Sequence, residues 1–155
     1  LQGNAARFPL PQPMVGTPNC DFSFSGLKTA VAREVQKLQA EDGLDGQAKA
    51  DICAAFQYSV AEALGDRLRQ AFGRCNELGY PELPCVIAGG VAANRYLRAA
   101  LEETCALHHS RLVAPPLRLC TDNAAMIAWA GIEKLRAGKM SDAAELEPKA
   151  RWPLY

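Results

Sequence analysis

Apolar side chains recur at helical spacing after residue 26, on a stripe formed by Leu27, Val31, Val35 and Leu38. Phe and Ser alternate over residues 22–25, which predicts a short, half-buried strand that leads into this helix. Ser25 is the predicted N-cap, because its hydroxyl can accept a hydrogen bond from the first turn. The helix ends at DGLDGQ, residues 42–47, where Gly and Asp favour a turn.

A second and longer helix is predicted from about Ala48 to Leu78, with Gly79 and Pro81 as its stop signals. Its apolar positions are spaced by four: Ile52, Phe56, Val60, Leu64, Leu68 and Phe72. Such a stripe advances by about 40° at each step and winds roughly half way round the helix. The helix therefore either meets different partners at its two ends or breaks near Gly65.

The rest of the chain reads as a strand and a helix, repeated once. PCVIAGG, residues 84–90, predicts a short buried strand, and RLVAPP, residues 111–116, predicts a second one. Helices follow them, with stripes of Leu97, Leu101 and Cys105 in the first, and of Met126, Ile127, Ala130 and Leu135 in the second, which Gly138 ends. Two strands joined by a helical crossover are parallel, so GGVAAN and LCTDNAA reach one edge of the sheet. The predicted fold class is α/β.

Open α/β sheets bind ligands at that edge. Gly89 and Gly90 would let the backbone approach a ligand closely, and a helix beginning near Ala92 would offer free N–H groups. Asn94, in the first turn, could hydrogen-bond a ribose or a phosphate. From these residues alone, a tight turn with a solvated Asn94 fits equally well, and the segment lacks the GxGxxG spacing of dinucleotide sites.

Asp122 starts the last predicted helix, where Asp is more often an N-cap than a ligand. Its place on the presumed ligand edge favours a function, but a metal needs several donors, and this chain places no others nearby. His108 and His109 are adjacent, so they do not share a helix face as in HExxH, and we expect them to form a cationic helix end. No separate catalytic residue is identified.

Composition excludes several classes of protein. Hydrophobic content of 49% predicts a folded domain, and 17 basic against 17 acidic residues give no long-range attraction for nucleic acid or membranes. The six cysteines form no CxxC pair, so we expect reduced thiols, with Cys53, Cys75 and Cys105 as small buried helix residues. No apolar run reaches the length of about 18 residues that a spanning helix needs, and no secretory signal is evident, so we expect a cytoplasmic protein.

Four blocks occur in order: DFSFSGLKTAV at 21–31, CVIAGGVAANRYLR at 85–98, CTDNAAMIAWAG at 120–131 and ARWPL at 150–154. Together they resemble the C-terminal half of the bacterial tRNA adenosine threonylcarbamoyltransferase catalytic subunit family (TsaD or Gcp, formerly O-sialoglycoprotein endopeptidase). The resemblance covers essentially the whole chain. It implies the helix-rich C-terminal part of an actin-like (ASKHA, ribonuclease H-like) two-lobe fold, with short parallel strands.

With this resemblance, the chain is expected to divide into four segments. They are a proline-rich lead-in (residues 1–19), a strand with a helical segment (20–80), a nucleotide-facing β-α-β-α unit (81–140) and a tail (141–155). The N-terminal lobe of the family would lie outside the chain. The lead-in shows no regular period and resembles the middle of the family's sequence.

The reaction that the resemblance implies transfers threonylcarbamoyl from threonylcarbamoyl-AMP to N6 of the adenosine 3′ of the anticodon, in tRNAs reading codons that begin with A. Gly89 and Gly90 resemble the adenosine motif, and Asn94 corresponds to a ligand-contacting Asn. Asp122 corresponds to an aspartate that coordinates the active-site metal, usually Fe²⁺. The family's other metal ligands are two histidines of an HxxxH motif, which this chain lacks.

The implied partners are tRNA, a paralogous actin-like subunit (TsaB) and a small ATPase (TsaE), with no membrane. Because the metal ligands are divided between two lobes, we expect the isolated chain to be inactive although its parent is an enzyme. The alternative is a non-catalytic actin-like lobe that binds nucleotide or scaffolds a complex. Asn94 and Asp122 argue against that alternative, since a scaffold needs neither.

Overall fold

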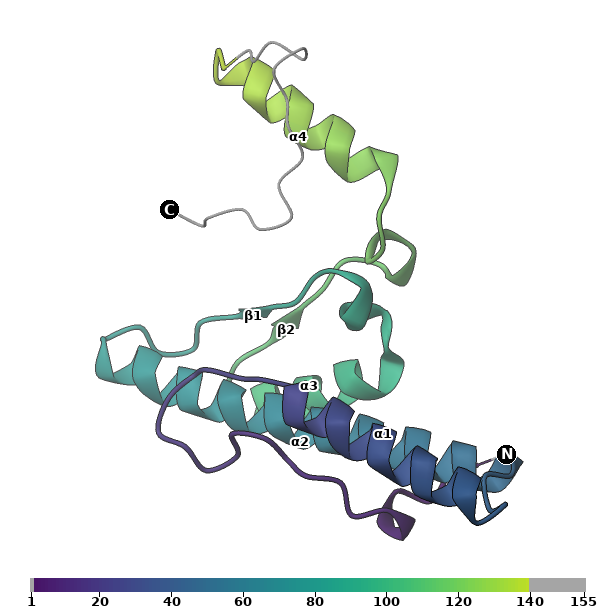
Figure 1. Ribbon diagram of the computed structural model, residues 1–155. Coiled ribbons are helices and arrows are strands. Elements are labelled where there is room, and N and C mark those ends of the chain that lie inside the picture. Colours follow the sequence, from purple (N-terminus) through teal and green to yellow (C-terminus); the bar gives the residue numbers. More distant parts are fainter. Residues whose placement is uncertain (1, 140–155) are drawn as a thin grey trace. The chain divides into compact units, whose positions relative to one another are not determined.

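The computed structural model describes residues 2–139, which fall into two compact units, with the division in the chain after Thr121. The first unit contains, in order, η1 (Ala5–Arg7), α1 (Ser25–Ala40), α2 (Gly46–Glu77), β1 (Cys85–Val86), η2 (Gly90–Ala93), α3 (Arg95–Leu107), β2 (Leu112–Val113) and η3 (Leu117–Leu119), where η denotes a 3₁₀ helix (Figure 1). The second unit contains α4 (Ala124–Arg136). The predicted α/β class with short parallel strands is confirmed.

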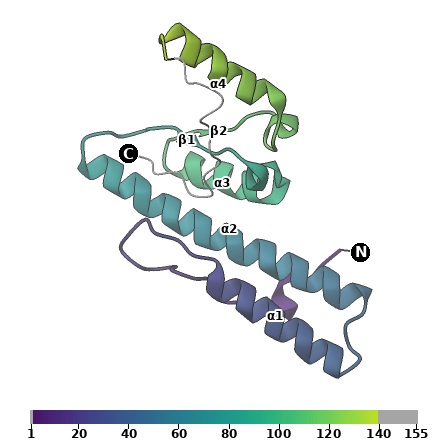
Figure 2. The same cartoon turned by 45° about the horizontal axis from the view of Figure 1, so that its top comes forward.

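Helices α1 and α2 lie side by side and are joined by a short turn, as both ribbon views show (Figures 1 and 2). The turn lies where DGLDGQ predicted it, and the Asp45 carboxylate begins α2 by accepting a hydrogen bond from the Ala48 N–H at 2.7 Å. The predicted stripe of α1 faces α2: Leu27 is fully buried, and Val31 and Val35 pack against buried residues of α2.

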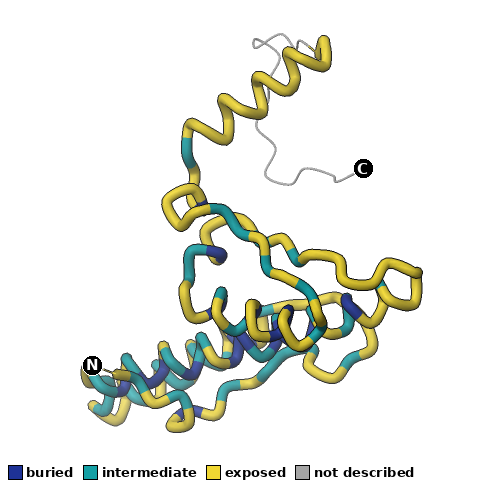
Figure 3. Tube along the Cα trace, turned by 180° about the vertical axis from the view of Figure 1, so that it is seen from behind, coloured by how far each residue is buried: buried dark blue, intermediate teal, exposed yellow. Residues whose placement is uncertain are grey.

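The 32-residue helix α2 runs without a break through Gly65. Its winding stripe serves two different clusters, because Ile52 packs with Phe8 from the start of the chain, whereas Val60 packs with Leu97 of α3. Gly65 lies where α2 and α3 come close, and a Cβ there would be 3.3 Å from the Thr104 hydroxyl oxygen. Different partners at the two ends, and not a break, therefore explain the pattern. Buried residues follow α2 along much of its length (Figure 3).

The predicted strand at 22–25 is wrong. Phe22 is exposed, Phe24 is half-buried, and α1 begins directly at Ser25. Ser25 is not the N-cap either, because Phe24 holds that position without a side-chain cap. A strand needs a neighbour for its backbone groups, and the two strands of the described chain pair with each other.

Strands β1 and β2 are parallel, as predicted, with Cys85 opposite Leu112 and Val86 opposite Val113. The Ile87 N–H extends the pairing by donating to the Val113 carbonyl at 3.0 Å. The expectation of a buried first strand is wrong for Val86, whose exposed fraction is 69%. A sheet of two short strands leaves one side of this residue uncovered within the first unit.

The lead-in packs along α2, although its sequence predicts no regular element. Asp51 of α2 accepts hydrogen bonds from the Asn4 N–H at 2.7 Å and from the Arg7 guanidinium at 2.8 Å, while Phe8 is buried. These two donors hold the pKa of the Asp51 carboxyl below its ordinary value of 3.8. The contacts fix the first residues of the chain on the helix.

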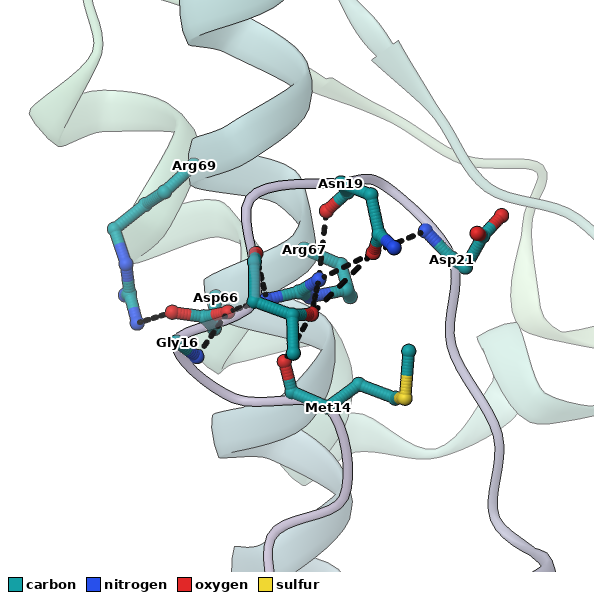
Figure 4. A network of polar contacts seen from close by, with 8 residues as sticks. Met14, Gly16, Asn19, Asp21, Asp66, Arg67 and Arg69 are labelled. Carbon is teal, nitrogen blue, oxygen red and sulfur yellow. Dashed lines mark hydrogen bonds and ion pairs between the residues drawn. The ribbon is translucent and has the colours of Figure 1, made fainter.

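Arg67 of α2 anchors the second half of the lead-in (Figure 4). Its guanidinium is almost completely buried and donates to the Thr17 hydroxyl at 2.7 Å and to the Asn19 carbonyl at 2.6 Å. It also pairs with the Asp66 carboxylate, which accepts a hydrogen bond from the Gly16 N–H at 3.2 Å. One arginine therefore satisfies polar groups of a loop that has no secondary structure of its own.

All six cysteines are free thiols, as expected. Cys105 is fully buried, and this burial raises the pKa of its thiol to about 11. Cys75 is half-buried, but the expectation of burial is wrong for Cys53, which is exposed on α2.

The end of α3 carries the histidine pair, as predicted. His108 is the C-cap residue, and its ring stacks on Phe72 with the centroids 5.2 Å apart. His109 has a φ of 54°, which lets the Ser110 N–H close the helix on the Cys105 carbonyl at 2.9 Å.

Helix α4 is confirmed, and Gly138 follows it with a φ of 67°. The ARWPL block and the predicted tail lie outside the described residues. Between residues 2 and 139, no helix combines the length and apolar character that crossing a bilayer requires.

Candidate functional site

The loops that follow the two parallel strands meet at one edge of the first unit. Helix η2 lies in the loop after β1, η3 lies in the loop after β2, and the two pack against each other. The prediction that both loops reach one edge therefore holds as far as Thr121. Asp122 belongs to the second unit and is described separately.

The first loop opens with Gly89 and Gly90, which differ in what they require. Gly89 has a φ of 83° and a ψ of 177°, a backbone region that essentially only glycine occupies. Gly90 has no such constraint, and a Cβ added to it would meet nothing within 4 Å. The backbone at Gly90 is therefore open to a ligand, whereas Gly89 is needed for the turn itself.

Asn94 is not in the first turn of α3, because the helix begins at Arg95 and Asn94 is its N-cap. Its Oδ1 accepts hydrogen bonds from the Tyr96 N–H at 3.0 Å and the Leu97 N–H at 3.2 Å. The helix also does not begin near Ala92, which lies in η2 and donates its N–H to the Gly89 carbonyl. The expected free N–H groups are thus mostly occupied within the chain.

The other end of the Asn94 side chain contacts α2. Its Nδ2 donates to Gln57 Oε1 at 3.0 Å, so Asn94 is neither solvated nor wholly directed at a ligand. An amide nitrogen carries two N–H bonds, and the second finds no partner among the described residues. Asn94 can therefore give one hydrogen bond to a ligand while it holds the loop on α2.

A mostly apolar cavity of about 730 Å³ lies beside this loop and is bordered by Gly90 and β1. Phe22, Phe24 and Phe56 give it aromatic walls, and Lys28 and Asn94 are its polar side chains. The volume suits a small molecule. The cavity can bury an apolar or aromatic group, but it offers few partners for a phosphate.

Arg98, one turn after Asn94, joins the two loops and was missed by sequence reasoning. Its guanidinium donates to the Ala92 carbonyl at 2.8 Å and to the Pro115 carbonyl at 3.1 Å. The one signal in the sequence is its position at i+4 from Asn94, which places both on the same side of the helix.

Asp122 is exposed and does not cap α4. The N-cap is Asn123, whose Oδ1 accepts a hydrogen bond from the Met126 N–H at 2.9 Å. The interpretation of Asp122 as a helix cap is therefore wrong. Its carboxylate has no hydrogen bond or ion pair within residues 2–139, and those residues contain no group of three or more His, Cys, Asp or Glu side chains able to hold a metal ion. Asp122 alone does not make a metal site.

Residues 1–129 match the family model described as tRNA N6-adenosine threonylcarbamoyltransferase. The chain belongs to this family. Curated members include those of Brucella anthropi, 54% identical over 156 residues, Agrobacterium fabrum, 50% over 157, and Rhodospirillum rubrum, 51% over 153. Each comparison covers 99% of this chain but 42% of the relative. The chain thus spans less than half the length of these threonylcarbamoyltransferases.

The two glycines of the first loop, Gly89 and Gly90, make a matched pair of test sites. We expect Gly89→Ala to lower the free energy of unfolding of the chain by about 1–3 kcal/mol, because alanine is strained at this backbone conformation. Gly90→Ala should change it by less than about 0.5 kcal/mol, since its methyl group enters open space. Urea unfolding of both variants measures this difference. Equal destabilisation would contradict the assignment of separate roles.

Proposed function

We propose that this chain is the C-terminal lobe of an enzyme that transfers threonylcarbamoyl from threonylcarbamoyl-AMP to N6 of the adenosine 3′ of the anticodon. The acceptors are tRNAs that read codons beginning with A. Support comes from membership of the family, and from the parallel strands whose loops meet at one edge. The proposed parent fold is the actin-like two-lobe fold, with this chain as part of its second lobe.

In the proposed reaction, the N6 amine attacks the carbonyl carbon of the mixed anhydride. A C–N bond forms, the C–O bond to the adenylate breaks, AMP leaves and N6 loses a proton. The residues assigned to nucleotide binding are Gly89, Gly90 and Asn94. Gly90 leaves the backbone accessible, Gly89 shapes the turn, and the second N–H of the Asn94 amide supplies a hydrogen bond.

Asp122 is proposed as one ligand of a divalent metal, Fe²⁺ by resemblance, whose other ligands lie outside this chain. The observation that carries this proposal is that Asn123, and not Asp122, caps α4, so the carboxylate is not needed to begin the helix. A metal bound there would act as a Lewis acid and offset charge on the leaving adenylate. One carboxylate is too few donors to hold it, so binding by the isolated chain should be weak.

The proposed partners are tRNA, the paralogous actin-like subunit TsaB and the small ATPase TsaE, and the proposed location is the cytoplasm. With 17 basic and 17 acidic residues, the chain brings no general attraction for RNA. Binding of tRNA would therefore depend on local contacts or on surfaces of the other subunits.

The test compares the purified 155-residue chain with the full-length protein, each mixed with TsaB, TsaE, tRNA and threonylcarbamoyl-AMP labelled in its threonine. We expect label on tRNA with the full-length protein and none above background with the chain, because a divided site cannot position the reacting groups. Label on tRNA in the mixture that contains the 155-residue chain in place of the full-length protein would overturn the claim that the chain is inactive. No transfer by the full-length protein would favour the alternative, a non-catalytic scaffolding lobe.

A further inference from the structure

The two loops at the sheet edge follow strands that pair only briefly, because β1 and β2 contribute two residues each. Beyond these strands, the loops form separate 3₁₀ helices, η2 and η3, which pack against each other. Such short strands do little to fix the distance between segments that follow them, because each flexible residue adds freedom. A contact from outside the sheet can therefore add to what spaces the loops.

Arg98 supplies this contact from a rigid position on α3. Its guanidinium reaches the Ala92 carbonyl of the first loop through Nε at 3.2 Å and Nη2 at 2.8 Å. The same Nη2 reaches the second loop at the Pro115 carbonyl, at 3.1 Å, and at Cys120 Sγ, at 3.4 Å. A planar guanidinium can hold these acceptors together, whereas a lysine ammonium has no such fork.

The backbone of α3 at Arg98 is held in place by packing and by a hydrogen bond. Its neighbour Leu97 is buried against Val60 of α2, and the Arg98 N–H donates to the Asn94 carbonyl at 3.0 Å in the first helical turn. At the far end of the contact, Cys120 has an exposed fraction of 3%. The guanidinium therefore links α3, whose Leu97 is buried, to the buried thiol of Cys120.

We propose that Arg98 is a positioning residue, which sets the spacing of the proposed nucleotide loop, residues 89–94, relative to residues 115–120 of the loop that follows β2. This rests on the proposed function, because it gives a purpose to the spacing of these loops. Cys120 and Pro115 both belong to the first unit, so the contacts of Arg98 lie within that unit. Arg98 acts through these loops and needs no contact with substrate.

Hydrogen–deuterium exchange of the 155-residue chain tests, without any ligand, whether Arg98 holds the two loops together. We call this set of Arg98 contacts the clasp. We expect Arg98→Met to speed exchange about tenfold in both 89–94 and 116–120, because losing a charged hydrogen bond lowers the cost of local opening. Amides in the middle of α2 are the internal reference for global stability and should change little. Arg95→Met, an exposed arginine on the same helix, is the matched control and should alter neither loop.

Three patterns of exchange would overturn the proposal: no change in either loop, a change in the first loop alone, or an equal rise throughout α2. The last would mean that Arg98 stabilises the fold in general. Simultaneous opening of two loops far apart in the sequence, with α2 unaffected, is the signature of a clasp.

A second readout connects the clasp to ligand binding. In the full-length protein, at a temperature where every variant is folded, Arg98→Lys should weaken AMP binding about fivefold or more, because a lysine cannot hold both loops. Arg95→Lys should leave the affinity unchanged, and equal affinities for the two variants would contradict a positioning role. If the wild-type protein does not bind AMP, the nucleotide part of the proposed function fails, and the exchange experiment still decides whether Arg98 clasps the loops.

Discussion

Under the proposed function, replacing Asp122 by Asn in the full-length protein should lower threonylcarbamoyl transfer to tRNA by at least about a hundredfold, and should remove most of the divalent metal proposed to bind this residue. Asparagine keeps the size of the side chain but loses the negative charge that a hard cation prefers. Because Asp122 is exposed and does not cap α4, the variant should fold normally. Metal content by mass spectrometry, transfer rate and thermal unfolding are the three measurements.

The next residue in the chain provides the matched control for this substitution. Asn123→Ala removes the cap of α4 and should cost about 1 kcal/mol of stability. Metal content should be kept, and transfer should stay within a few-fold of wild type at temperatures where the protein is folded. If Asp122→Asn destabilises α4 and Asn123→Ala does not, then Asp122 is the structural residue and its assignment as a ligand is wrong.

Replacing Arg67 by Met should lower the free energy of unfolding of the chain by about 3–5 kcal/mol. The Arg67 side chain is buried, and its loss would leave the Thr17 carbonyl without its donor. The Asp66 carboxylate would keep only the Gly16 N–H and the more distant Arg69 guanidinium. Methionine fills similar space, so the loss would come from the unpaired polar groups and less from a cavity. Equilibrium unfolding in urea measures the effect.

One control separates this burial effect from a general effect of charge. Arg69→Met removes a half-exposed arginine that lies 3.9 Å from the same carboxylate, and should cost less than about 1 kcal/mol. If Arg67→Met and Arg69→Met lowered the free energy of unfolding equally, burial of the Arg67 network would add no stability beyond that of an exposed ion pair.

The pH dependence of the same pair has a definite sign. The pKa of Asp66 is held below its ordinary value of 3.8, mainly by its hydrogen bond from Arg67. A lowered pKa in the folded state gives stability that is present above pH 3.8 and is lost as the pH falls through the folded value. Wild-type stability should therefore fall on acidification below about pH 4, and this dependence should be weaker in Arg67→Met.

The helices could be predicted from two features of the sequence: apolar residues at helical spacing, and residues that end a helix. Leu27, Leu97 and Leu101 are buried where the spacing placed them, and Gly79 ends α2 with a φ of 81°. Parallel pairing followed from the chain order of strand, helix and strand. The alternation at Phe22 and Phe24 misled because period two shows which residues share a face, but not whether a neighbouring strand exists.

The candidate site was predictable in its location but not in its hydrogen bonds. Capping by Asn123 and not by Asp122 depends on one residue of register, which composition near a helix start does not fix. The role of Asn94 depends on Gln57, which lies 37 residues earlier on another helix. Arg98 and Arg67 bind backbone carbonyls, and such acceptors leave no trace in the sequence.

The unbroken course of α2 bears on how the first unit unfolds. This helix holds the lead-in through Asp51 and Arg67, contacts Asn94 of the loop after β1 through Gln57, and meets α3 closely at Gly65. Both hydrophobic clusters include residues of α2, so cleaving α2 near its middle would separate one cluster from the other. The lead-in, the loop and α3 should therefore melt in a single step, and no shorter piece of the unit should survive proteolysis as a folded domain.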